Sequence, residues 1–409
     1  MNILLINHYA GSPVYGMEYR PYYLAREWIR LGHQVRIVAS AQSHVRAKQP
    51  DLQEAGRLNE IIDGIQYTWF KTPTYAGNGI GRVRNMAAFV WRLFLEGRQL
   101  ARSFKPDVVI ASSTYPMVIW PAHRFAKLTN AKLVFEVHDL WPLSPMELGG
   151  MSRWHPFIML LQAAENYAYR QADVVISMLP KVRAYMESHG MASHKLHIVP
   201  NGIDPDEWSA EGQPLPRIVV EKLTQLKLEG NAIVGYAGSH GVANALDSLL
   251  DVAKLMQQEK IVFVLVGGGP DKALLQQRAQ KEGMHNVLFV DPVLKEQIPA
   301  LLQWFDVVYI GLQRQPLFRF GIAPNKLMDY MMSARPVLMA IDAGNDPVAE
   351  AGCGLTVQPE NPQSVVEGVR RLMALSAEER RAMGQRGRAF VLEKHTYPVL
   401  ARKFLEVLS

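Results

Sequence analysis

Residues 1–40, MNILLINHYAGSPVYGMEYRPYYLAREWIRLGHQVRIVAS, predict a strand, a loop, a helix and a second strand. The short apolar run at residues 3–6 is typical of a strand that is buried on both faces of a sheet. Apolar residues then recur at helical spacing until Gly32, which stands where glycine commonly ends a helix. Residues 35–39 are apolar again and supply the next strand. The chain therefore opens with a β-α-β unit.

Strands and helices go on alternating along the rest of the chain. Further apolar runs, with helix-like segments between them, lie at residues 107–111, 132–137, 173–177, 232–237, 261–266, 287–290, 306–310 and 336–340. This order predicts an α/β protein with parallel, doubly wound sheets. The turn-rich sequence VPNGIDPDEW at residues 199–208 interrupts it. We therefore expect two Rossmann-like domains, residues 1–203 and 204–390, that hold a ligand in a cleft between them.

The composition fits a protein with large globular cores. The 409 residues are 48% hydrophobic and 20% charged, which excludes disordered and collagen-like chains. The single cysteine, Cys353, excludes an intrachain disulfide and a cysteine zinc site, and it favours a reducing compartment. The net charge of +6 suits an anionic ligand or an anionic membrane surface, but it is too dispersed to indicate binding of nucleic acid.

No segment has the pattern of a signal peptide or a membrane-spanning helix. The N-terminal apolar stretch is short, lacks a basic leader and is interrupted by Asn7 and His8. No apolar run approaches the ~20 residues of a spanning helix. We therefore expect a cytoplasmic protein that is at most peripheral to the inner face of the cytoplasmic membrane.

The loop GSPVYGMEYR at residues 11–20 follows the first strand and opens a helix. Its backbone N–H groups and the helix dipole can meet an anion, and Arg20 could clamp a phosphate. Its two glycines do not form the G-x-G-x-x-G dinucleotide fingerprint. The alternative is an ordinary loop with an arginine at the surface.

The second half has a corresponding loop in YAGSHGVANALDSLL at residues 236–250. Small residues there let a diphosphate approach the backbone closely, and Ser239 and Asn244 can donate hydrogen bonds to it. The turn GGGP at residues 267–270 suits either the approach of a ligand or close packing. One such loop in each half indicates an anionic ligand.

Two further stretches carry ionisable side chains at positions that suit chemistry. In EVHDLWP at residues 136–142, His138 and Asp139 end a strand, where a histidine can hydrogen-bond a substrate hydroxyl or donate a proton. The alternative is a structural loop in which Asp139 caps backbone amides. No H-E-x-x-H motif or cysteine cluster predicts a metal site.

In FGIAPNKLMDYMMSARPVLMA at residues 320–340, Lys326 and Asp329 stand three apart at the start of a helix, near one face. The lysine adds charge where the dipole already favours phosphate, and the aspartate could accept hydrogen bonds from ribose hydroxyls. The alternative is an exposed ion pair.

Residues 79–104, GIGRVRNMAAFVWRLFLEGRQLARSF, form a basic and aromatic amphipathic stretch. An apolar block at helical spacing is surrounded by arginines; the block is Met86, Phe89, Val90, Leu93 and Phe94, and the arginines are Arg82, Arg84, Arg92, Arg98 and Arg102. Such a helix could lie in the interface of an anionic membrane, anchored by Trp91. The alternative is a core helix with a solvated basic edge.

Taken together, these motifs resemble those of the family 4 glycosyltransferases, which have the GT-B fold of two Rossmann-like domains and use nucleotide sugars. The resemblance covers nearly the whole chain, through YGMEYRPYYLAREWIRLGHQV, HDLWP, VPNGID, VLVGGGP and PNKLMDYMMSARPVL. It is greatest to the branch that makes bacterial surface polysaccharides, in which the donor lysine lies in a P-x-K-x-x-[DE]-Y motif. A C-terminal helix at residues 391–409 is then expected to return to the first domain.

The resemblance implies roles for individual residues. Lys326 would contact the donor diphosphate, Asp329 would bind ribose, and His138 would face the transferred sugar or the acceptor; His138 and Lys326 are thus the catalytic candidates. The implied donor-binding set is Gly238, Ser239, His240, Asn244, Val290, Pro292, Ile322, Ala323, Pro324, Asn325, Lys326 and Asp329, with residues 289–293 bracketing the base. The implied acceptor-side set is Tyr15, Gly16, Glu18, Arg20 and Asp139. Transfer in this family retains the anomeric configuration without a bound metal, the leaving diphosphate being stabilised electrostatically.

The sequence departs from the family pattern at the donor phosphates. The two-glutamate motif of the family would place carboxylates at positions 321 and 329, which are Gly321 and Asp329 here. The usual arginine and lysine of the glycine-rich turn correspond to Ser239 and Asn244. Lys326 and the helix N-termini therefore remain as the main stabilisation of donor charge.

We expect a retaining hexosyl- or N-acetylhexosaminyltransferase that uses a UDP-sugar and a lipid-linked saccharide acceptor, with no cofactor. Two alternatives remain open. A nucleotide-sugar epimerase of the same fold would need a carboxylate-rich pocket, and the sequence shows no such cluster near His138. A non-catalytic nucleotide-sugar-binding subunit would explain Gly321, Ser239 and Asn244.

Overall fold

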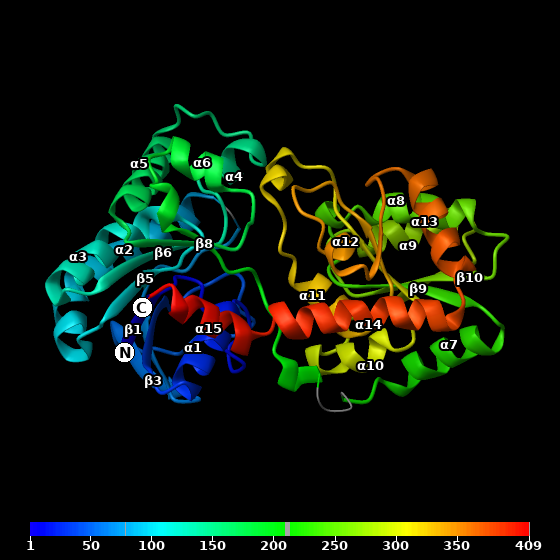
Figure 1. Cartoon of the computed structure of the whole chain (residues 1–409), viewed down its shortest axis with the longest axis horizontal. Helices are drawn as coiled ribbons and strands as arrows, with labels where there is room; N and C mark the ends of the chain where they lie inside the picture. The colour runs from blue at the N-terminus through cyan, green and yellow to red at the C-terminus, as the bar shows by residue number, and fades with distance from the viewer. Residues whose placement is uncertain (78, 209–212, 409) are drawn as a thin grey trace. The chain divides into compact units, whose positions relative to one another are not determined.

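The structure is a computed structural model that describes residues 1–77, 79–208 and 213–408 as two compact units (Figure 1). Unit 1 comprises Met1–Asn201 together with the C-terminal residues from Tyr397 onward, and unit 2 comprises Gly202–Thr396. Each unit has its own sheet and its own hydrophobic core.

The sheet of unit 1 has the strand order β3-β4-β2-β1-β5-β6-β7-β8. Its strands are β1 (Asn2–Ile6), β2 (Gln34–Ser40), β3 (Arg57–Ile62), β4 (Ile65–Phe70), β5 (Val108–Ala111), β6 (Lys132–Val137), β7 (Val174–Ser177) and β8 (Leu196–Ile198). All neighbouring strands are parallel except β3 and β4. The central strands are buried along almost their whole length, which explains their continuous apolar runs.

Helices cover both faces of this sheet. α1 (Arg20–Arg30) and α15 (Tyr397–Glu406) lie on one face, and α2 (Ile80–Phe104), α3 (Ile119–Thr129) and α5 (Pro156–Gln171) lie on the other (Figure 1). The shorter helices α4 (Leu143–Glu147) and α6 (Arg183–Ser188) complete the unit. α15 packs on α1, where the Trp28 indole donates a hydrogen bond to the carbonyl of Ala401 at 3.2 Å and the rings of Tyr23 and Tyr397 stack.

The antiparallel hairpin β3–β4 corrects the expectation of a purely parallel sheet. Ile62 pairs with Ile65, so Asp63 and Gly64 form a two-residue loop, and both have positive φ, 50° and 81°. Asp-Gly in this position is the preferred sequence for a type I′ hairpin turn, so the sequence did carry the signal.

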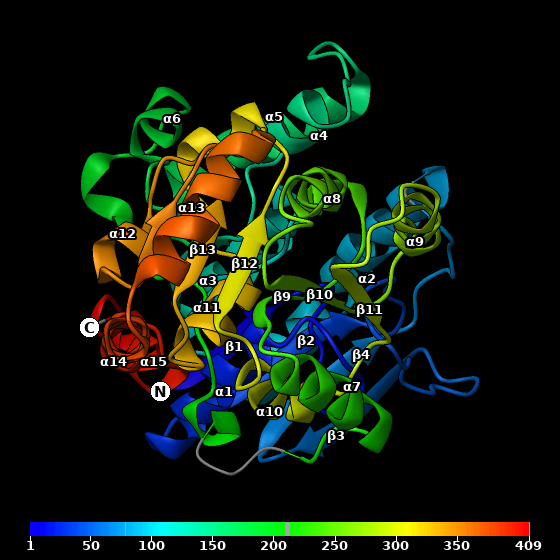
Figure 2. The ribbon, with the colours of Figure 1, turned by 90° about the vertical axis from the view of Figure 1, so that its right-hand side faces the viewer.

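Unit 2 contains a six-stranded parallel sheet in the order β11-β10-β9-β12-β13-β14. Its strands are β9 (Ala232–Ala237), β10 (Ile261–Val266), β11 (Val287–Val290), β12 (Val307–Gly311), β13 (Val337–Ala340) and β14 (Gly354–Thr356). Its helices are α7 (Arg217–Leu228), α8 (Leu246–Leu255), α9 (Lys272–Lys281), α10 (Ile298–Leu302), α11 (Asn325–Met332), α12 (Pro347–Ala351), α13 (Pro362–Ala374) and α14 (Ala377–Lys394). In Figure 2, α8, α9 and α13 lie on one side of this sheet and α7, α10 and α14 on the other.

The strand order of each unit reverses next to its first strand, between β1 and β5 in unit 1 and between β9 and β12 in unit 2. Doubly wound sheets bind their ligands beyond the carboxyl ends of the strands at this reversal. The residues that follow β1, β5, β6 and β9 are therefore the first places to look for a site.

Candidate functional site

The two glycine-rich turns of unit 2 pack against each other at the carboxyl ends of β9 and β10. The Gly238 N–H donates to the carbonyl of Val266, and the His240 N–H donates to the carbonyl of Gly268. Gly267 has a φ of 146°, and a Cβ there would lie 1.9 Å from the carbonyl oxygen of Gly238. Glycine is thus required for this close packing, which is one of the two interpretations that the sequence left open for the turn GGGP.

Lys326 reaches this place from the first turn of α11. Its Nζ donates to the Tyr236 hydroxyl at 2.9 Å and to Asn244 Oδ1 at 2.7 Å, and it lies over the Tyr236 ring. A Cβ on Gly238 would lie 3.0 Å from Nζ, so glycine leaves room for the ammonium group. Burial lowers the pKa of Lys326 to about 8. The ammonium group is therefore held by two neutral groups, with no carboxylate partner among the described residues.

Asn244 and Ser239 orient this lysine. The amide Nδ2 of Asn244 donates to the Ser239 carbonyl at 3.0 Å, and the Tyr236 hydroxyl donates to the same carbonyl at 2.7 Å. One N–H of the Asn244 side chain therefore binds the turn, and its oxygen accepts from Lys326. It thereby positions the lysine, and its expected donation to a ligand through the second N–H stays a prediction.

His240 is fully buried beside Lys326 and Lys272. Burial, followed by repulsion from Lys272 and Lys326, lowers the pKa of His240 to about 4, so the ring is neutral at pH 7. Neither ring nitrogen has a hydrogen-bond partner in the part of the chain that the structure describes. A buried imidazole with both nitrogens unpaired is costly, which fits a position that a ligand completes.

Asp329 does not join Lys326 at the glycine turns. Burial raises the pKa of its carboxyl to about 7, and its neighbours are Lys295, Glu207 and Trp208, whose side chain donates a hydrogen bond to it. Although they stand only three positions apart in the chain, Lys326 and Asp329 thus face different groups. The ribose-binding role implied for Asp329 stays a prediction.

Of the remaining expected donor-binding residues, Val290 and Pro292 lie at these turns, and residues 322–325 precede or begin α11. Val290 accepts hydrogen bonds from the Gly267 N–H at 3.1 Å and from Lys272 Nζ at 3.2 Å, and Pro292 packs beside Gly268. Residues 322–325 lead into α11: Ile322 pairs through its backbone with the Asn345 amide, and Ala323, Pro324 and Asn325 follow it.

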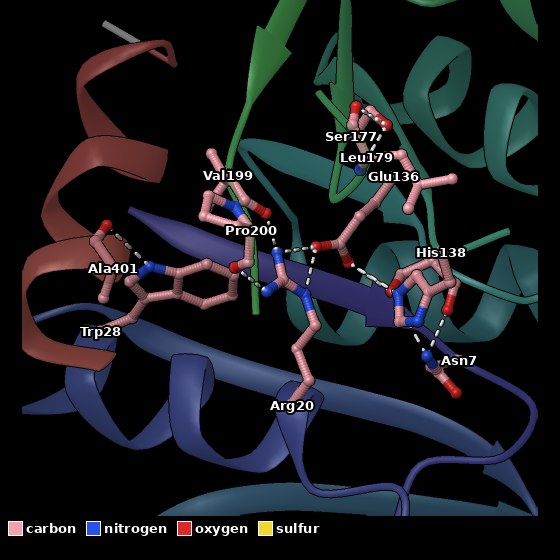
Figure 3. A network of polar contacts seen from close by, with 11 residues as sticks. Asn7, Arg20, Trp28, Glu136, His138, Ser177, Leu179, Val199, Pro200 and Ala401 are labelled. Carbon is pink, nitrogen blue, oxygen red and sulfur yellow. Dashed lines mark hydrogen bonds and ion pairs between the residues drawn. The ribbon is translucent and has the colours of Figure 1, made fainter. Parts of the chain in front are cut away.

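A polar network lies at the reversal point of unit 1 (Figure 3). His138 Nε2 lies 3.2 Å from Glu136 Oε2 and 2.9 Å from the Ser112 hydroxyl. Ser112 follows β5 and donates to Glu136 Oε2 at 2.5 Å, while Asn7, which follows β1, donates through Nδ2 to the carbonyl of Ser112. Three adjacent strands therefore contribute to the surroundings of His138.

Arg20 is neither an arginine at the surface nor free to clamp a phosphate, because it is buried and paired. Its side chain is 1% exposed, and its Nε and Nη2 donate to Glu136 Oε1 at 3.0 and 2.9 Å. Nη1 and Nη2 also donate to the carbonyls of Pro200 and Val199. Burial alone would raise the pKa of the Glu136 carboxyl, but Arg20 and the hydrogen bonds from His138 and Ser112 hold it well below its usual range. The arginine therefore supports the site from inside the unit.

The other expected acceptor-side residues lie in two loops. Tyr15 is buried and donates to Glu60 Oε2 at 3.2 Å, whereas Gly16 turns the loop at a φ of 94°. The Glu18 carbonyl accepts from the Gly11 N–H at 2.8 Å. Asp139 accepts from the Ser144 hydroxyl at 3.1 Å, and burial raises the pKa of its carboxyl. A backbone hydrogen bond from Leu140 to Asp139 is of the kind that the structural alternative described, and the acceptor-side role of Asp139 stays a prediction.

Helix α2 presents two faces with different roles. The buried face contains Asn85, Met86, Phe89, Leu93, Gly97, Leu100, Ala101 and Phe104. Three members of the expected membrane-binding block, Met86, Phe89 and Leu93, therefore belong to the core of unit 1. Arg82 stacks on Tyr9 and Trp141, and Arg92 pairs with Glu96 at 3.5 Å.

Sequence reasoning missed Glu136, Ser112 and Tyr236 as site residues. Glu136 is a charged residue inside the apolar strand LVFEV, two residues before His138, and side chains two apart lie on one face of a strand. That combination was the available signal. For Ser112 and Tyr236 the sequence offered none, because both were hidden at the ends of ordinary strands.

Across residues 1–77, 79–208 and 213–408, no three histidine, cysteine, aspartate or glutamate side chains gather as they would around a metal ion. Metal-independent transfer stays a prediction, because it concerns the reaction and not the resting structure.

Residues 15–202 match the model of the glycosyl transferase 4-like domain, and residues 231–374 match that of the glycosyl transferases group 1 domain. The two models cover most of the chain, which belongs to the glycosyltransferases of the GT-B fold with these two domains. It is similar to WcaI of Escherichia coli K12, named as a glycosyl transferase of colanic acid biosynthesis, with 24% identity over 88% of this chain and 92% of that protein.

Solved structures show the same fold. Sucrose-phosphate synthase from Thermosynechococcus elongatus matches with a TM-score of 0.72 and 16% identity, over 100% of this chain and 98% of that one. HepE of Anabaena, solved in complex with UDP and glucose, matches with a TM-score of 0.67 and 16% identity, over 100% and 99% of the two chains. These likenesses to solved structures show that the chain has the same two-domain fold.

Proposed function

We propose that this protein is a retaining glycosyltransferase that transfers a hexosyl or N-acetylhexosaminyl group from a UDP-sugar to a lipid-linked saccharide. The binding of a nucleotide-sugar donor is inferred mainly from the ammonium group of Lys326. It is buried beside two glycine-rich turns and has no carboxylate partner among the described residues. An anion that binds there supplies the missing counter-charge. The solved complex of HepE with UDP and glucose and the polysaccharide role in the name of WcaI support this choice of substrates.

In this proposal unit 2 stabilises the leaving diphosphate. Negative charge builds up on the diphosphate as the glycosidic bond breaks, and a preorganised cation and backbone N–H groups stabilise it most at that moment. Tyr236 and Asn244 hold Lys326 in place beforehand, so little reorganisation is needed. His240 offers one N–H and one acceptor to the same ligand.

Incubation of the purified protein with labelled UDP-sugars separates the proposal from its alternatives. A transferase moves the label to an acceptor or slowly hydrolyses the donor, whereas an epimerase converts the nucleotide sugar, and a binding subunit retains it unchanged. A thermal-shift panel of nucleotide sugars identifies the donor beforehand, because tight binding raises the Tm. A panel without any shift would argue against the proposal.

Donor affinity should depend on pH through Lys326. Its pKa of about 8 means that the ammonium form prevails at pH 7 and the neutral amine at pH 9. A diphosphate binds the charged form better, so the Kd for UDP should rise as the pH increases through 8. Lys326→Arg is the matched control, since an arginine stays protonated over this range. Calorimetry that shows the same pH dependence for both proteins would contradict the assignment.

We also propose that α2 attaches the protein to the inner face of the cytoplasmic membrane. Its exposed face, opposite the buried one, carries Ile80, Arg84, Trp91, Leu95, Arg98 and Arg102 at intervals of three, four or seven residues. Trp91 is 64% exposed and Leu95 59%. The side chains of Arg84, Arg98 and Arg102 are exposed and form no hydrogen bond or ion pair with another described residue. None of the helices in the described ranges is long and apolar enough to cross a membrane.

Liposome flotation tests this attachment. Each arginine near an anionic surface contributes about 1 kcal/mol, so binding should require anionic lipid and weaken at high salt. Replacing Arg84, Arg98 and Arg102 together with glutamine should release the protein while UDP binding persists. The control replaces the exposed Arg371, Arg381 and Arg402 with glutamine. It makes the same change of charge on other helices and should not release the protein. Equal flotation on neutral and anionic vesicles would overturn the proposal.

A further inference from the structure

The network beneath His138 determines where its hydrogen atoms lie. Glu136 is 1% exposed and contacts Arg20 through Oε1 and both Ser112 and His138 through Oε2. A carboxylate that pairs with a buried guanidinium has no proton and can only accept hydrogen bonds. Each group that contacts it must therefore donate.

Ser112 has a single hydroxyl proton, and the 2.5 Å contact directs that proton to Glu136 Oε2. The Ser112 oxygen can then only accept from His138 Nε2, which lies 2.9 Å away. Both neighbours of Nε2 are thus acceptors, and Nε2 must carry the hydrogen. In the neutral ring, Nδ1 consequently has a free lone pair.

Nδ1 is the ring atom that a ligand can reach. It has no hydrogen-bond partner among the described residues. It is also not one of the unpaired side-chain atoms that are closed to solvent. The His138 side chain is 10% exposed, whereas Glu136 beneath it is closed to solvent. The ring therefore has one nitrogen bound inside the unit and the other directed to the outside.

We propose that Glu136, held by Arg20, is a positioning residue that fixes His138 as the Nε2–H tautomer, so that Nδ1 accepts a hydrogen bond from a hydroxyl group of the bound saccharide. The contact with saccharide rests on the proposed function, but the tautomer does not. The guanidinium group of Arg20 donates to Glu136 Oε1, and it also donates to the carbonyls of Val199 and Pro200, which hold the guanidinium group in place. The Glu136 carboxylate is thus held at Oε1 by Arg20 and at Oε2 by Ser112 and His138.

The tautomer can be measured without any substrate. Nitrogen-15 NMR of histidine side chains distinguishes Nε2–H from Nδ1–H, and the spectrum of His138→Gln assigns the signals of His138. We expect the Nε2–H form alone in the wild type and a mixture of tautomers in Glu136→Gln. An Nδ1–H or mixed signal in the wild type would overturn the proposal, whatever the reaction turns out to be.

Kinetics then test the link to the saccharide. Glu136→Gln should lower kcat about 10- to 100-fold, which is the effect of removing the partner that orients a metal-bound histidine, and leave the KM for the donor unchanged. Glu165→Gln is the matched control, because Glu165 is equally buried in unit 1 and contacts Tyr169 and Tyr185, away from His138. A loss of kcat with an unchanged tautomer would reduce Glu136 to a structural role. If NMR shows the expected tautomers but no transferase activity is found, the tautomer assignment stands and the proposed function is refuted.

Discussion

Lys326→Ala is expected to lower turnover about 10²–10³-fold at saturating donor, the usual loss when one preorganised electrostatic donor is removed. Lys326 Nζ is the cation directly at the Gly238 turn, and it is held by Tyr236 and Asn244. Because neither partner is charged, removing the ammonium group leaves no buried carboxylate behind, and the fold should persist. Steady-state kinetics with circular dichroism as the check on folding measure this.

Two variants sharpen this experiment. Lys326→Arg should restore activity only in part, because a planar guanidinium does not replace a compact ammonium group between two fixed acceptors. Lys254→Ala removes an exposed lysine of α8 that pairs with Glu282 at 2.8 Å, and it should retain full activity. If Lys326→Ala kept nearly wild-type turnover, the phosphate site would have to lie elsewhere.

His138→Ala should lose transfer about 10²–10⁴-fold, the range for a positioned acid or base, and still bind free UDP as the wild type does. His138 belongs to unit 1 and the glycine turns to unit 2. In the proposal the histidine contacts the sugar or the acceptor, and the nucleotide is bound by unit 2. Turnover assays together with calorimetry of UDP binding separate the two roles.

A matched histidine serves as the control. His189 also lies in unit 1, half-buried, and its Nδ1 contacts the Tyr185 carbonyl at 2.8 Å. His189→Ala should leave transfer intact. A collapse of UDP affinity in His138→Ala would instead give His138 a structural or nucleotide-binding role.

Much of the fold could be predicted from the sequence, because strands buried on both faces are written as continuous apolar runs. The runs at residues 132–137 and 261–266 coincide with β6 and β10. The edge hairpin β3–β4 was missed, since β3 is half-exposed, both strands mix polar and apolar residues, and only the Asp63-Gly64 turn marks them. Periodicity identifies interior strands well and edge strands poorly.

The site could be predicted less fully, because its contacts join residues far apart in the chain. The glycine turns and Lys326 were recognisable from local spacing, but the contact of Lys326 with Tyr236 spans ninety positions. Arg20 illustrates the same difficulty. An arginine after a glycine-containing loop resembles a phosphate ligand, and only the fold shows that Glu136 neutralises it. The helical pattern of α2 was clear, whereas the choice of its buried face depended on the sheet beneath it.

Proton NMR of the anomeric signal of the donor tests the central claim most directly. The wild-type protein is incubated with the nucleotide sugar that stabilises it and with a lipid-linked saccharide that accepts the sugar, and the anomeric proton is followed while UDP is released. We expect the donor signal to be replaced by a product signal of the same anomeric configuration, at a rate that falls about 10²–10³-fold in Lys326→Ala. A product of inverted configuration, an epimerised nucleotide sugar, or a donor that binds and stays intact would contradict retaining glycosyl transfer by this protein.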